Sequence, residues 1–326
     1  MAFRTGYDHC EQIHCWRSRP GLLLFFAFAA CRSAHVSGAG TADCAVAKAP
    51  EVATHVIAPM LVSNSGQGPE QLPLATVTVL DVGQGTAVVV RSGPQTLVYD
   101  TGGGNPTGNN IANIVLLPFL RYHGVETLQT LLVSHSDNDH SAGVVDVQKA
   151  MQVEQIIVGG YSGDYRKAAP CIAGRAWQWS PAVRFQILSP SRWQGESSNN
   201  SSCVLMLHVG DYRLLLAGDI DADRERELVA YWSGSLRSTG LLAAHHGSGT
   251  SSATAWLKQV RPDHLIYSAG YLNRFGHPHP SVVQRGQRFA RAQYSTASAG
   301  ALTVTIEKNG KALIVEHRVA RRRYWQ

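Results

Sequence analysis

The 326-residue sequence predicts an α/β fold built in layers, in which β-sheets are covered by helices. Residues 76–100 alternate short β-branched runs with Gly and Pro turns, which is the pattern of an antiparallel meander. Later in the chain, short apolar runs alternate with segments of helical periodicity. Only 16% of the residues are charged and 31 are Gly, which favours a buried sheet with many turns over a helical bundle.

The meander is predicted to contain strands at 76–80, 87–91 and 96–100. Apolar runs predict the later strands at 131–133, 155–158, 204–207, 213–216, 241–244 and 264–267. Helical patterns are expected near 111–123, 143–152, 221–232, 252–260 and 280–292. The sequence has no repeat of solenoid period, and we assign all of these elements to one domain at residues 74–326.

Residues 1–73 are predicted to be a leader and linker that precedes this domain. Arg17 and Arg19 come before an apolar run at 21–30, and small residues follow, as in a secretory signal. That run is too short for an ordinary transmembrane helix. The sequence contains no apolar run of the ~18–20 residues that a span needs, which excludes a multi-span membrane protein. A cleaved signal, a short membrane anchor and an unstructured extension all remain open.

The chain has six Cys residues. Four of them fall in the predicted leader and lack the spacing of a zinc finger: Cys10, Cys15, Cys31 and Cys44. Cys171 and Cys203 fall in the predicted domain. They form a disulfide if the chain is exported, or stay reduced as two buried thiols if it is not.

The charge of the chain permits an anionic partner without requiring one. There are 29 Lys and Arg against 23 Asp and Glu, a formal net charge of +6. Residues 318–325 place four Arg beside Tyr324 and Trp325. Arg pairs with phosphate and aromatic rings stack on bases, so this tail is either a nucleic-acid contact or a solvated chain end.

Acidic and histidine side chains follow three of the predicted strands. After the strand at 131–133 come two imidazoles and two carboxylates, and Asp219 follows the strand at 213–216. His245 and His246 follow the strand at 241–244. Since open α/β sheets build their sites at the carboxyl ends of strands, we expect these side chains to lie together.

The first of these motifs is His135-x-Asp137-x-Asp139-His140. Nitrogen and carboxylate ligands suit zinc, manganese or iron, and the lack of thiolates disfavours a purely structural zinc site. Asp219 has two oxygens with which to bridge two metals. A metal ion here would make a water molecule acidic near neutral pH and so supply a nucleophile. The alternative is a polar loop of capping and salt-bridging residues without metal.

Together these motifs resemble the metallo-β-lactamase superfamily, and more narrowly the C-terminal domain of the DNA-internalisation competence proteins of the ComEC type. The narrower resemblance covers residues 76–326, with the motifs in the same order. They are the segments 81–85 (DVGQG), 99–102 (YDTG), 134–143 (SHSDNDHSAG), 199–205, 215–219 (LLAGD), 245–251 (HHGSGTS), 268–270 and 275–278 (FGHP).

The resemblance implies a four-layer αββα sandwich with one or two divalent metal ions, zinc or manganese, at the edge between the sheets. The metal ligands that it implies are His135 and Asp137 for one metal, Asp139 and His140 for the other, and Asp219 as the bridge. Of the later pair, His245 is the first choice as a ligand and His246 the second. Asp81 and Asp100 would orient the site; a turn-forming role is the alternative for Asp81.

The sequence departs from the hydrolytic lactamases, which usually carry a further His before the bridging Asp. Asn199, Asn200 and Ser202 stand in that region, as in the competence-type domains. The first metal would then have fewer protein ligands, and a single-metal site becomes an alternative. Asn200 and Ser202 could instead bind phosphate oxygens. His277 either protonates a leaving oxygen, contacts a phosphate or packs in its loop. The expected catalytic residues are therefore Asp139, Asn200, Ser202 and His277.

The function that the resemblance implies is a metal-dependent hydrolase of the competence type, acting as a phosphodiesterase or nuclease on single-stranded DNA during uptake for transformation. The alternatives are a hydrolase of a small ester, lactone or lactam, and a non-catalytic DNA-binding module. The Gly-rich segment 102–106 lacks the P-loop Lys and spacing, so no nucleotide cofactor is expected. We expect a membrane channel subunit as a partner and a periplasmic or inner-membrane-associated location on the extracytoplasmic face, with the cytoplasm as the alternative.

Overall fold

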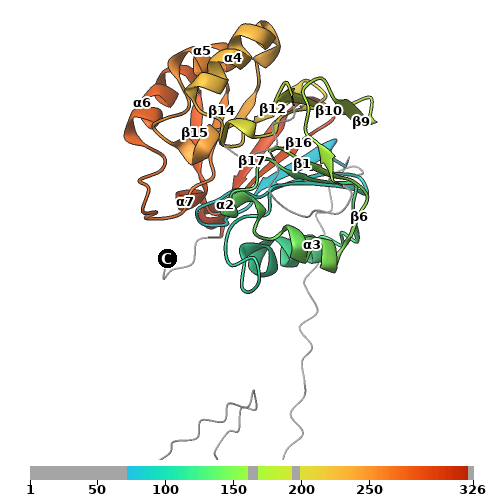
Figure 1. Cartoon of the computed structure of the whole chain (residues 1–326). Coiled ribbons are helices and arrows are strands. Elements are labelled where there is room, and N and C mark those ends of the chain that lie inside the picture. The colour runs from blue at the N-terminus through green and yellow to red at the C-terminus, as the bar shows by residue number, and fades with distance from the viewer. Residues whose placement is uncertain (1–71, 161–167, 193–198, 322–326) are drawn as a thin grey trace, which may run out of the picture. The chain divides into compact units, whose positions relative to one another are not determined.

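Two large β-sheets lie face to face in the chain, and helices cover both outer faces (Figure 1). The computed structural model describes residues 72–160, 168–192 and 199–321. Within these residues the layers run helix, sheet, sheet, helix, which confirms the αββα sandwich. The predicted leader up to residue 71 and residues 322–326 of the Arg-rich tail lie outside the described residues.

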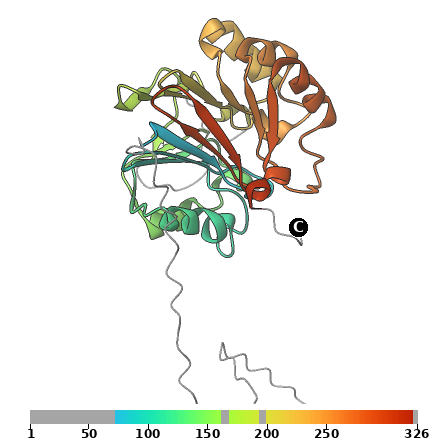
Figure 2. The same ribbon diagram turned by 180° about the vertical axis from the view of Figure 1, so that it is seen from behind.

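The first sheet has the strand order β17-β16-β1-β2-β3-β5-β7-β8. Its strands are β1 (Ala75–Val79), β2 (Val88–Ser92), β3 (Gln95–Tyr99), β5 (Thr130–Val133), β7 (Ile156–Val158), β8 (Ala169–Pro170), β16 (Leu302–Ile306) and β17 (Ala312–Glu316). The predicted meander is confirmed, because β1, β2 and β3 pair antiparallel in sequence order. From β3 to β8 the pairing is parallel. Figure 2 shows the hairpin of β16 and β17 beside β1.

The second sheet has the strand order β15-β14-β13-β12-β11-β10-β9. Its strands are β9 (Ala176–Ser180), β10 (Val183–Ser189), β11 (Val204–Val209), β12 (Tyr212–Leu216), β13 (Gly240–Leu242), β14 (His264–Tyr267) and β15 (Ala292–Ser295). β12 to β15 are parallel, so the carboxyl ends of β12, β13 and β14 meet at one edge. A separate short pair consists of β4 (Thr127–Leu128) and β6 (Gln152–Val153).

The helices fall into two groups that cover opposite faces. Over the first sheet lie the π-helical turn η1 (Ala112–Leu116), α1 (Leu117–Tyr122) and α3 (Val144–Ala150). Over the second lie α4 (Ala222–Trp232), α5 (Thr254–Val260) and α6 (Pro280–Phe289). The short turns are α2 (Asn138–Ser141), α7 (Thr296–Ala299), α8 (His317–Ala320), η2 (Asn199–Ser201), η3 (Ser233–Leu236) and η4 (Ala244–Gly247).

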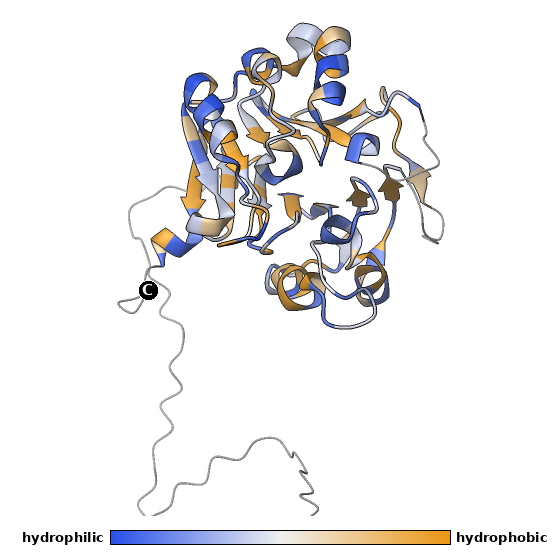
Figure 3. Ribbon diagram, turned by 60° about the vertical axis from the view of Figure 1, so that its left-hand side comes forward, coloured by the Kyte–Doolittle hydropathy of each residue, from blue (hydrophilic) through white to orange (hydrophobic). Residues whose placement is uncertain are grey.

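The strands are apolar on both faces because each face meets a different core. In β11, Leu205 and Leu207 point into the core between the sheets, whereas Val204 and Met206 point toward α4 to α6. Successive side chains of a strand alternate between its faces, so a strand buried on both sides is a continuous apolar run. Figure 3 shows hydrophobic colour along many of the strands, and a mixture of hydrophilic and hydrophobic residues on the helices.

A disulfide joins Cys171 to Cys203. Cys171 directly follows β8 of the first sheet, and Cys203 directly precedes β11 of the second. The bond therefore links the two sheets at their shared core, in which both residues are buried. Of the two states considered for these cysteines, the structure has the bonded one.

The described residues contain no helix that is both long enough and apolar enough to span a membrane.

Candidate metal centre

The predicted motifs meet at the edge where β5, β12 and β13 end. Asp139, His140, Asp219 and His246 each place one donor atom there, and these atoms lie within 4.8 Å of one another. His140, Asp219 and His246 are buried, and the Asp139 side chain is 35% exposed. The cluster is thus closed on the protein side and open at Asp139.

The backbone around His246 is held in a rarely populated conformation. His245 and His246 have φ values of 52° and 56°, in the left-handed region that residues other than Gly seldom adopt. Gly247 follows with φ 85°, and a Cβ at this position would come within 2.7 Å of Pro278 Cβ. Such strain costs about 1–3 kcal/mol per residue and persists where the surrounding structure holds a functional geometry.

Asp100 determines how the His140 imidazole points. Its Oδ2 lies 2.7 Å from His140 Nδ1, and it also accepts hydrogen bonds from the backbone N–H and the hydroxyl of Ser134 at 2.6 and 2.7 Å. Because Asp100 accepts, Nδ1 carries the proton. His140 Nε2 then faces Asp219 Oδ1 at 3.2 Å. A carboxylate behind an imidazole in this way is a common support of metal-binding histidines.

Ser268 orients His246 in the same manner. His246 Nδ1 lies 2.9 Å from the Ser268 carbonyl oxygen, which can only accept, so this nitrogen carries the proton. His246 Nε2 lies 3.1 Å from Asp139 Oδ2 and 3.4 Å from Asp219 Oδ2. Both imidazoles therefore direct the same atom, Nε2, at the carboxylates.

Opposite charges in the cluster outweigh the cost of burying them. Burial opposes a charge on His140, but the carboxylates of Asp219 and Asp100 raise the pKa of His140 well above its usual value. Burial likewise opposes ionisation of Asp219, whose pKa the imidazoles of His140 and His246 hold well below its usual range. Despite burial, the hydrogen bond from His246 and the charge of His140 lower the pKa of Asp139 to about 2.

This donor set fits a divalent metal. Two imidazole nitrogens and two carboxylates converge, and zinc and manganese accept both kinds of ligand. A divalent cation bound here would replace the proton that His140 shares with the carboxylates, so that binding releases a proton.

His135 and Asp137 lie beside this cluster but contribute less to it. The His135 ring stands 4.3 Å from the His140 ring, and its Nδ1 faces the Ser134 hydroxyl at 3.0 Å. Its Nε2 is buried without a hydrogen-bond partner among the described residues, and Asp137 Oδ2 is 3.5 Å away. Asp137 is 51% exposed. The pair forms an incomplete second set of ligands at the edge of the first.

Of the two adjacent histidines, the structure brings the second choice into the cluster. His246 Nε2 reaches both Asp139 and Asp219. His245 Nε2 stands 3.8 Å from Asp219 Oδ2, and its side chain is 27% exposed. His245 Nδ1 lies 3.5 Å from the Asn199 amide nitrogen. His245 thus lies at the rim of the site rather than in it.

Asn200 and Ser202 are placed as supports of the loops around the site. The Asn200 side chain donates to Asp221 Oδ2 at 2.8 Å and accepts from the Asp221 N–H at 3.0 Å, while Asp221 caps α4. The buried Ser202 hydroxyl accepts from the Asp219 N–H at 3.0 Å. The hydrogen bonds of both side chains therefore go to protein groups.

Asp81 pairs with an arginine rather than with a residue of the four-residue cluster. Its Oδ2 pairs with the guanidinium of Arg318 on α8 at 2.5 Å. Asp81 therefore ties the loop after β1 to the end of the described chain, whereas Asp100 has the orienting position that was predicted for both.

His277 lies at the mouth of the site. Its ring centroid is 5.8 Å from that of His245 and 6.4 Å from that of His246. Gln84 Oε1 accepts the N–H of Gly270, which orients the amide so that Nε2 donates to His277 Nδ1. His277 Nε2 then carries the proton. Burial and the imidazoles of His246 and His245 lower the pKa of His277, which favours the neutral ring.

Three supporting residues were not singled out from the sequence: Ser134, Ser268 and Gln84. All three lie inside the motifs that carry the family resemblance: Ser134 and Ser268 directly follow predicted strands, and Gln84 lies between the strands predicted at 76–80 and 87–91. Their position in the motifs was the available signal, but their contacts depend on tertiary structure.

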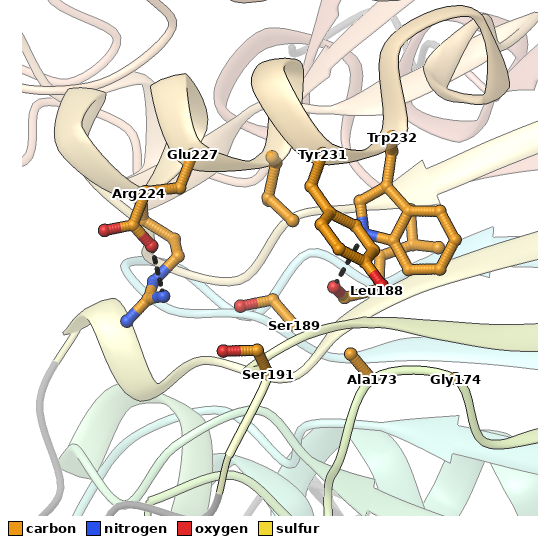
Figure 4. Close-up of a pocket in the computed structure, with 10 residues that line it drawn as sticks. Ala173, Gly174, Leu188, Ser189, Ser191, Arg224, Glu227, Tyr231 and Trp232 are labelled. Atoms are coloured by element: carbon orange, nitrogen blue, oxygen red, sulfur yellow. Dashed lines mark hydrogen bonds and ion pairs between the residues drawn. The ribbon is translucent and has the colours of Figure 1, made fainter.

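A cavity of about 650 Å³ adjoins the cluster at Asp139. It is lined by the loops after β1, β3 and β14 and by the start of α2, including Gly83, Gly104, Phe275 and Asn138. A second cavity, of about 300 Å³, lies between α4 and β10 and shares none of these residues (Figure 4). There Arg224 pairs with Glu227, and Trp232 Nε1 donates to the Leu188 carbonyl.

The family model of the metallo-β-lactamase superfamily matches residues 80–271, from the end of β1 to the loop after β14. The chain belongs to this superfamily. The match includes all four residues of the candidate metal cluster.

Relatives of this superfamily member include named competence and recombination proteins. It is 37% identical over 235 residues to Recombination protein 2 of Haemophilus influenzae, covering 71% of this chain and 29% of that protein. It is 37% identical over 248 residues to Competence protein ComA of Neisseria gonorrhoeae, covering 74% and 34%. The chain thus spans about a third of the length of these relatives. These matches confirm the predicted resemblance to competence proteins.

Solved structures with a similar fold include the metallo-β-lactamase fold protein YhfI from Bacillus subtilis. It is 12% identical, with a TM-score of 0.46, and the match covers 74% of this chain and 99% of that one. The β-hydroxylase CmlA from Streptomyces venezuelae is 11% identical, with a TM-score of 0.47, over 73% of this chain and 55% of that one.

Proposed function

We propose that this chain is a divalent-metal-dependent phosphodiesterase that hydrolyses DNA during uptake for transformation. The observation that carries the proposal is the cluster of Asp139, His140, Asp219 and His246, which opens into a cavity at Asp139. The similarity to a competence protein and a recombination protein favours DNA as the substrate. The proposal includes nuclease activity, and zinc or manganese as the metal.

In this proposal the cluster residues hold the metal, and His135 with Asp137 provides an optional second position. When bound, a divalent metal polarises a phosphoryl oxygen and makes water acidic enough to lose a proton near neutral pH. Asp100 and Ser268 keep the two Nε2 atoms aimed at the site. Water adds to phosphorus and loses a proton to solvent, the bond to one bridging oxygen breaks, and that oxygen takes up a proton from solvent.

We assign His277 a hydrogen bond to a phosphate oxygen of the substrate. Its Nε2–H points away from the Gln84 amide, which occupies Nδ1, and the lowered pKa keeps the ring neutral. A neutral imidazole donates a hydrogen bond through its N–H group but is a weak general acid. Of the roles predicted for His277, phosphate contact is therefore favoured over protonation of the leaving oxygen.

The proposal extends to the setting in which the chain works. A disulfide between Cys171 and Cys203 is typical of proteins in oxidising compartments, which supports an extracytoplasmic location. The resemblance to competence proteins supports a membrane channel subunit as a partner, with single-stranded DNA as the passing substrate.

A nuclease assay tests the function. The full chain, freed of metal by a chelator, is incubated with a labelled single-stranded oligonucleotide and added Mn²⁺ or Zn²⁺. We expect cleavage only with metal, and a loss of at least ~100-fold in rate for Asp139→Ala, more than the ~10–100-fold typical of losing a group that orients a ligand. Asp223→Ala is the control, since Asp223 is an exposed carboxylate on α4.

Thermal unfolding of each variant separates loss of activity from loss of folding. Cleavage that survives Asp139→Ala unchanged would refute the mechanism. Metal-dependent hydrolysis of an ester, lactone or lactam without cleavage of DNA would replace the proposed substrate. Binding of DNA without any metal-dependent cleavage would leave a non-catalytic module.

A further inference from the structure

We propose that Tyr271, Arg274 and Phe275, on the loop between β14 and α6, form a stacking site for unpaired bases of the substrate strand. The inference rests on the proposed function and adds the residues that hold the strand and the means by which they select it. It starts from side chains that the metal cluster does not use.

The loop exposes large apolar side chains beside the candidate metal cluster. Tyr271 is 75% exposed, Leu272 84% and Phe275 52%. Tyr271, Arg274 and Phe275 line the same cavity of about 650 Å³ that reaches Asp139. Exposed apolar groups gathered at one place mark binding surfaces more often than scattered ones do.

These side chains are held out by a rigid turn. The Asn273 side chain donates to the carbonyl oxygens of Gly270 and His277 at 2.9 and 2.5 Å, and it accepts from the N–H groups of Phe275 and His277 at 3.2 and 3.0 Å. The turn is also fixed to the loop after β1, because Gly270 donates to Gln84. The backbone that carries the rings is therefore fixed before any ligand arrives, which lowers the entropy lost on binding.

A series of rings leads from the metal cluster to this loop. The planes of His246 and His277 differ by 27° with centroids 6.4 Å apart, and those of His277 and Phe275 differ by 25° at 5.7 Å. The guanidinium carbon of Arg274 lies 4.8 Å from the centre of the Phe275 ring. A nucleotide whose phosphate lies at the cluster would thus have flat groups within reach of its neighbouring bases.

The chemistry of the cavity wall fits a nucleic acid strand. Arg274 provides positive charge and Asn138 provides an amide, and among the described residues that line the cavity the only acidic one is Asp139, which belongs to the metal cluster. Aromatic rings and guanidinium planes stack on bases of any sequence, because every base has a π-face. In a duplex these faces are covered by neighbouring pairs, so the site selects unpaired strands.

Binding measurements test the stacking site separately from cleavage. The full chain with metal is titrated into a labelled single strand with a nuclease-resistant phosphorothioate backbone, and anisotropy gives the Kd. We expect Phe275→Ala and Tyr271→Ala each to weaken binding about 5- to 100-fold. Phe275→Trp should restore it. Neither alanine variant should unfold at a lower temperature, since both side chains are exposed.

Tyr231→Ala is the matched control. Tyr231 is 78% exposed and lines the separate cavity of Figure 4, with Arg224 and Trp232 beside it, but it stands at the far end of α4 from Asp219. It should bind the strand like the wild type. An abasic strand provides the second comparison: the wild type should bind it at least as weakly as Phe275→Ala binds the normal strand, and removal of the bases should cost Phe275→Ala less affinity than it costs the wild type.

The outcomes separate this inference from the proposed function. Base-dependent binding that Phe275→Ala weakens, in a chain that never cleaves DNA, supports the stacking site and refutes the nuclease. Cleavage by wild type and Phe275→Ala alike, with equal affinity for normal strands, supports the nuclease and overturns the stacking site. An equal loss of affinity for normal and abasic strands, or an equal loss in Tyr231→Ala, also overturns it.

Discussion

Asp100 accepts three hydrogen bonds with two carboxylate oxygens, and the position of His140 depends on all of them. The donors are the backbone N–H and hydroxyl of Ser134 and Nδ1 of His140. Asp100, Ser134 and His140 are all buried, so water cannot take the place of a lost acceptor. An Asn side chain at residue 100 would offer one accepting oxygen, and its NH2 group would face one of these three donors without accepting from it.

Asp100→Asn is therefore expected to weaken metal binding while it leaves the four ligands in the chain. Asp100 has a φ of 60°, a conformation that Asn also tolerates, so the backbone can stay in place. Loss of such an orienting group typically costs ~10–100-fold in metal affinity. Titration of Zn²⁺ or Mn²⁺ against a competing chelator measures the change.

Asp81→Asn is the control for that titration. Asp81 pairs with Arg318 on α8 rather than with a residue of the cluster, so its affinity for metal should match the wild type. Equal metal affinity in Asp100→Asn and the wild type would contradict the orienting role of Asp100.

At the scale of the elements, the buried Glu225 joins two helices. It lies on α4, and its carboxylate oxygens accept the N–H groups of Ser252 and Ala253 at 2.6 and 2.8 Å, just before α5. Burial raises the pKa of Glu225 to about 8, although the two backbone hydrogen bonds oppose the shift. The contact between α4 and α5 should therefore depend on pH.

The direction follows from the protons that each state binds. In the unfolded chain Glu225 loses its proton near its ordinary pKa of 4.5, whereas in the folded chain it keeps the proton up to about pH 8. Between these values the folded state binds more protons, so its stability falls as the pH rises, by about 1.4 kcal/mol per pH unit. Above the folded pKa this contribution no longer changes.

Glu225→Gln should remove this part of the pH dependence. Its Oε1 can accept only some of the hydrogen bonds, so the variant should be ~1–3 kcal/mol less stable than the wild type at about pH 5. The deficit should shrink or reverse at about pH 8. Urea unfolding at both pH values measures it. Glu227→Gln, an exposed carboxylate on the same helix, should keep the wild-type slope; parallel slopes in all three proteins would contradict the prediction.

The elements that could be predicted from the sequence are those buried on two sides or paired in the meander. β11 and β12 are continuous apolar runs because each lies between two cores. β9 and β17 were missed, since each is an edge strand with mostly half-exposed residues and so has no strong apolar pattern. β10, β15 and β16 were missed as well, although β10 and β16 are well buried.

The composition of the site could be predicted, but not the choice between adjacent histidines. Strand ends and family motifs gave Asp139, His140 and Asp219. His246 is selected over His245 by the Ser268 carbonyl, 22 residues further along the chain, which accepts from His246 Nδ1. Such contacts arise from tertiary packing, and spacing within one motif does not contain them.

At the scale of the whole molecule, the two sheets are joined by packing and by one covalent bond. The core between them holds side chains of both sheets, and the disulfide closes a loop with a sequence separation of 32 residues across it. Both sheets supply residues to the metal cluster, Asp139 and His140 after β5 and Asp219 and His246 after β12 and β13. The geometry of the site therefore depends on how the sheets are held together.

Reduction of the disulfide is expected to destabilise the chain without unfolding it at room temperature. In the chain-entropy account, closing a loop of this length contributes about 4 kcal/mol, which corresponds to roughly 8–16 °C in Tm for a domain of this size. Tm measured with and without a reductant tests this. A variant carrying both Cys171→Ala and Cys203→Ala should melt near the reduced wild type and should not respond to the reductant. Its remaining cysteines are shared with the wild type, so the difference between the two proteins isolates this bond. A wild-type Tm that the reductant leaves unchanged, or an equal drop in the double variant, would show that the link between the sheets contributes no stability.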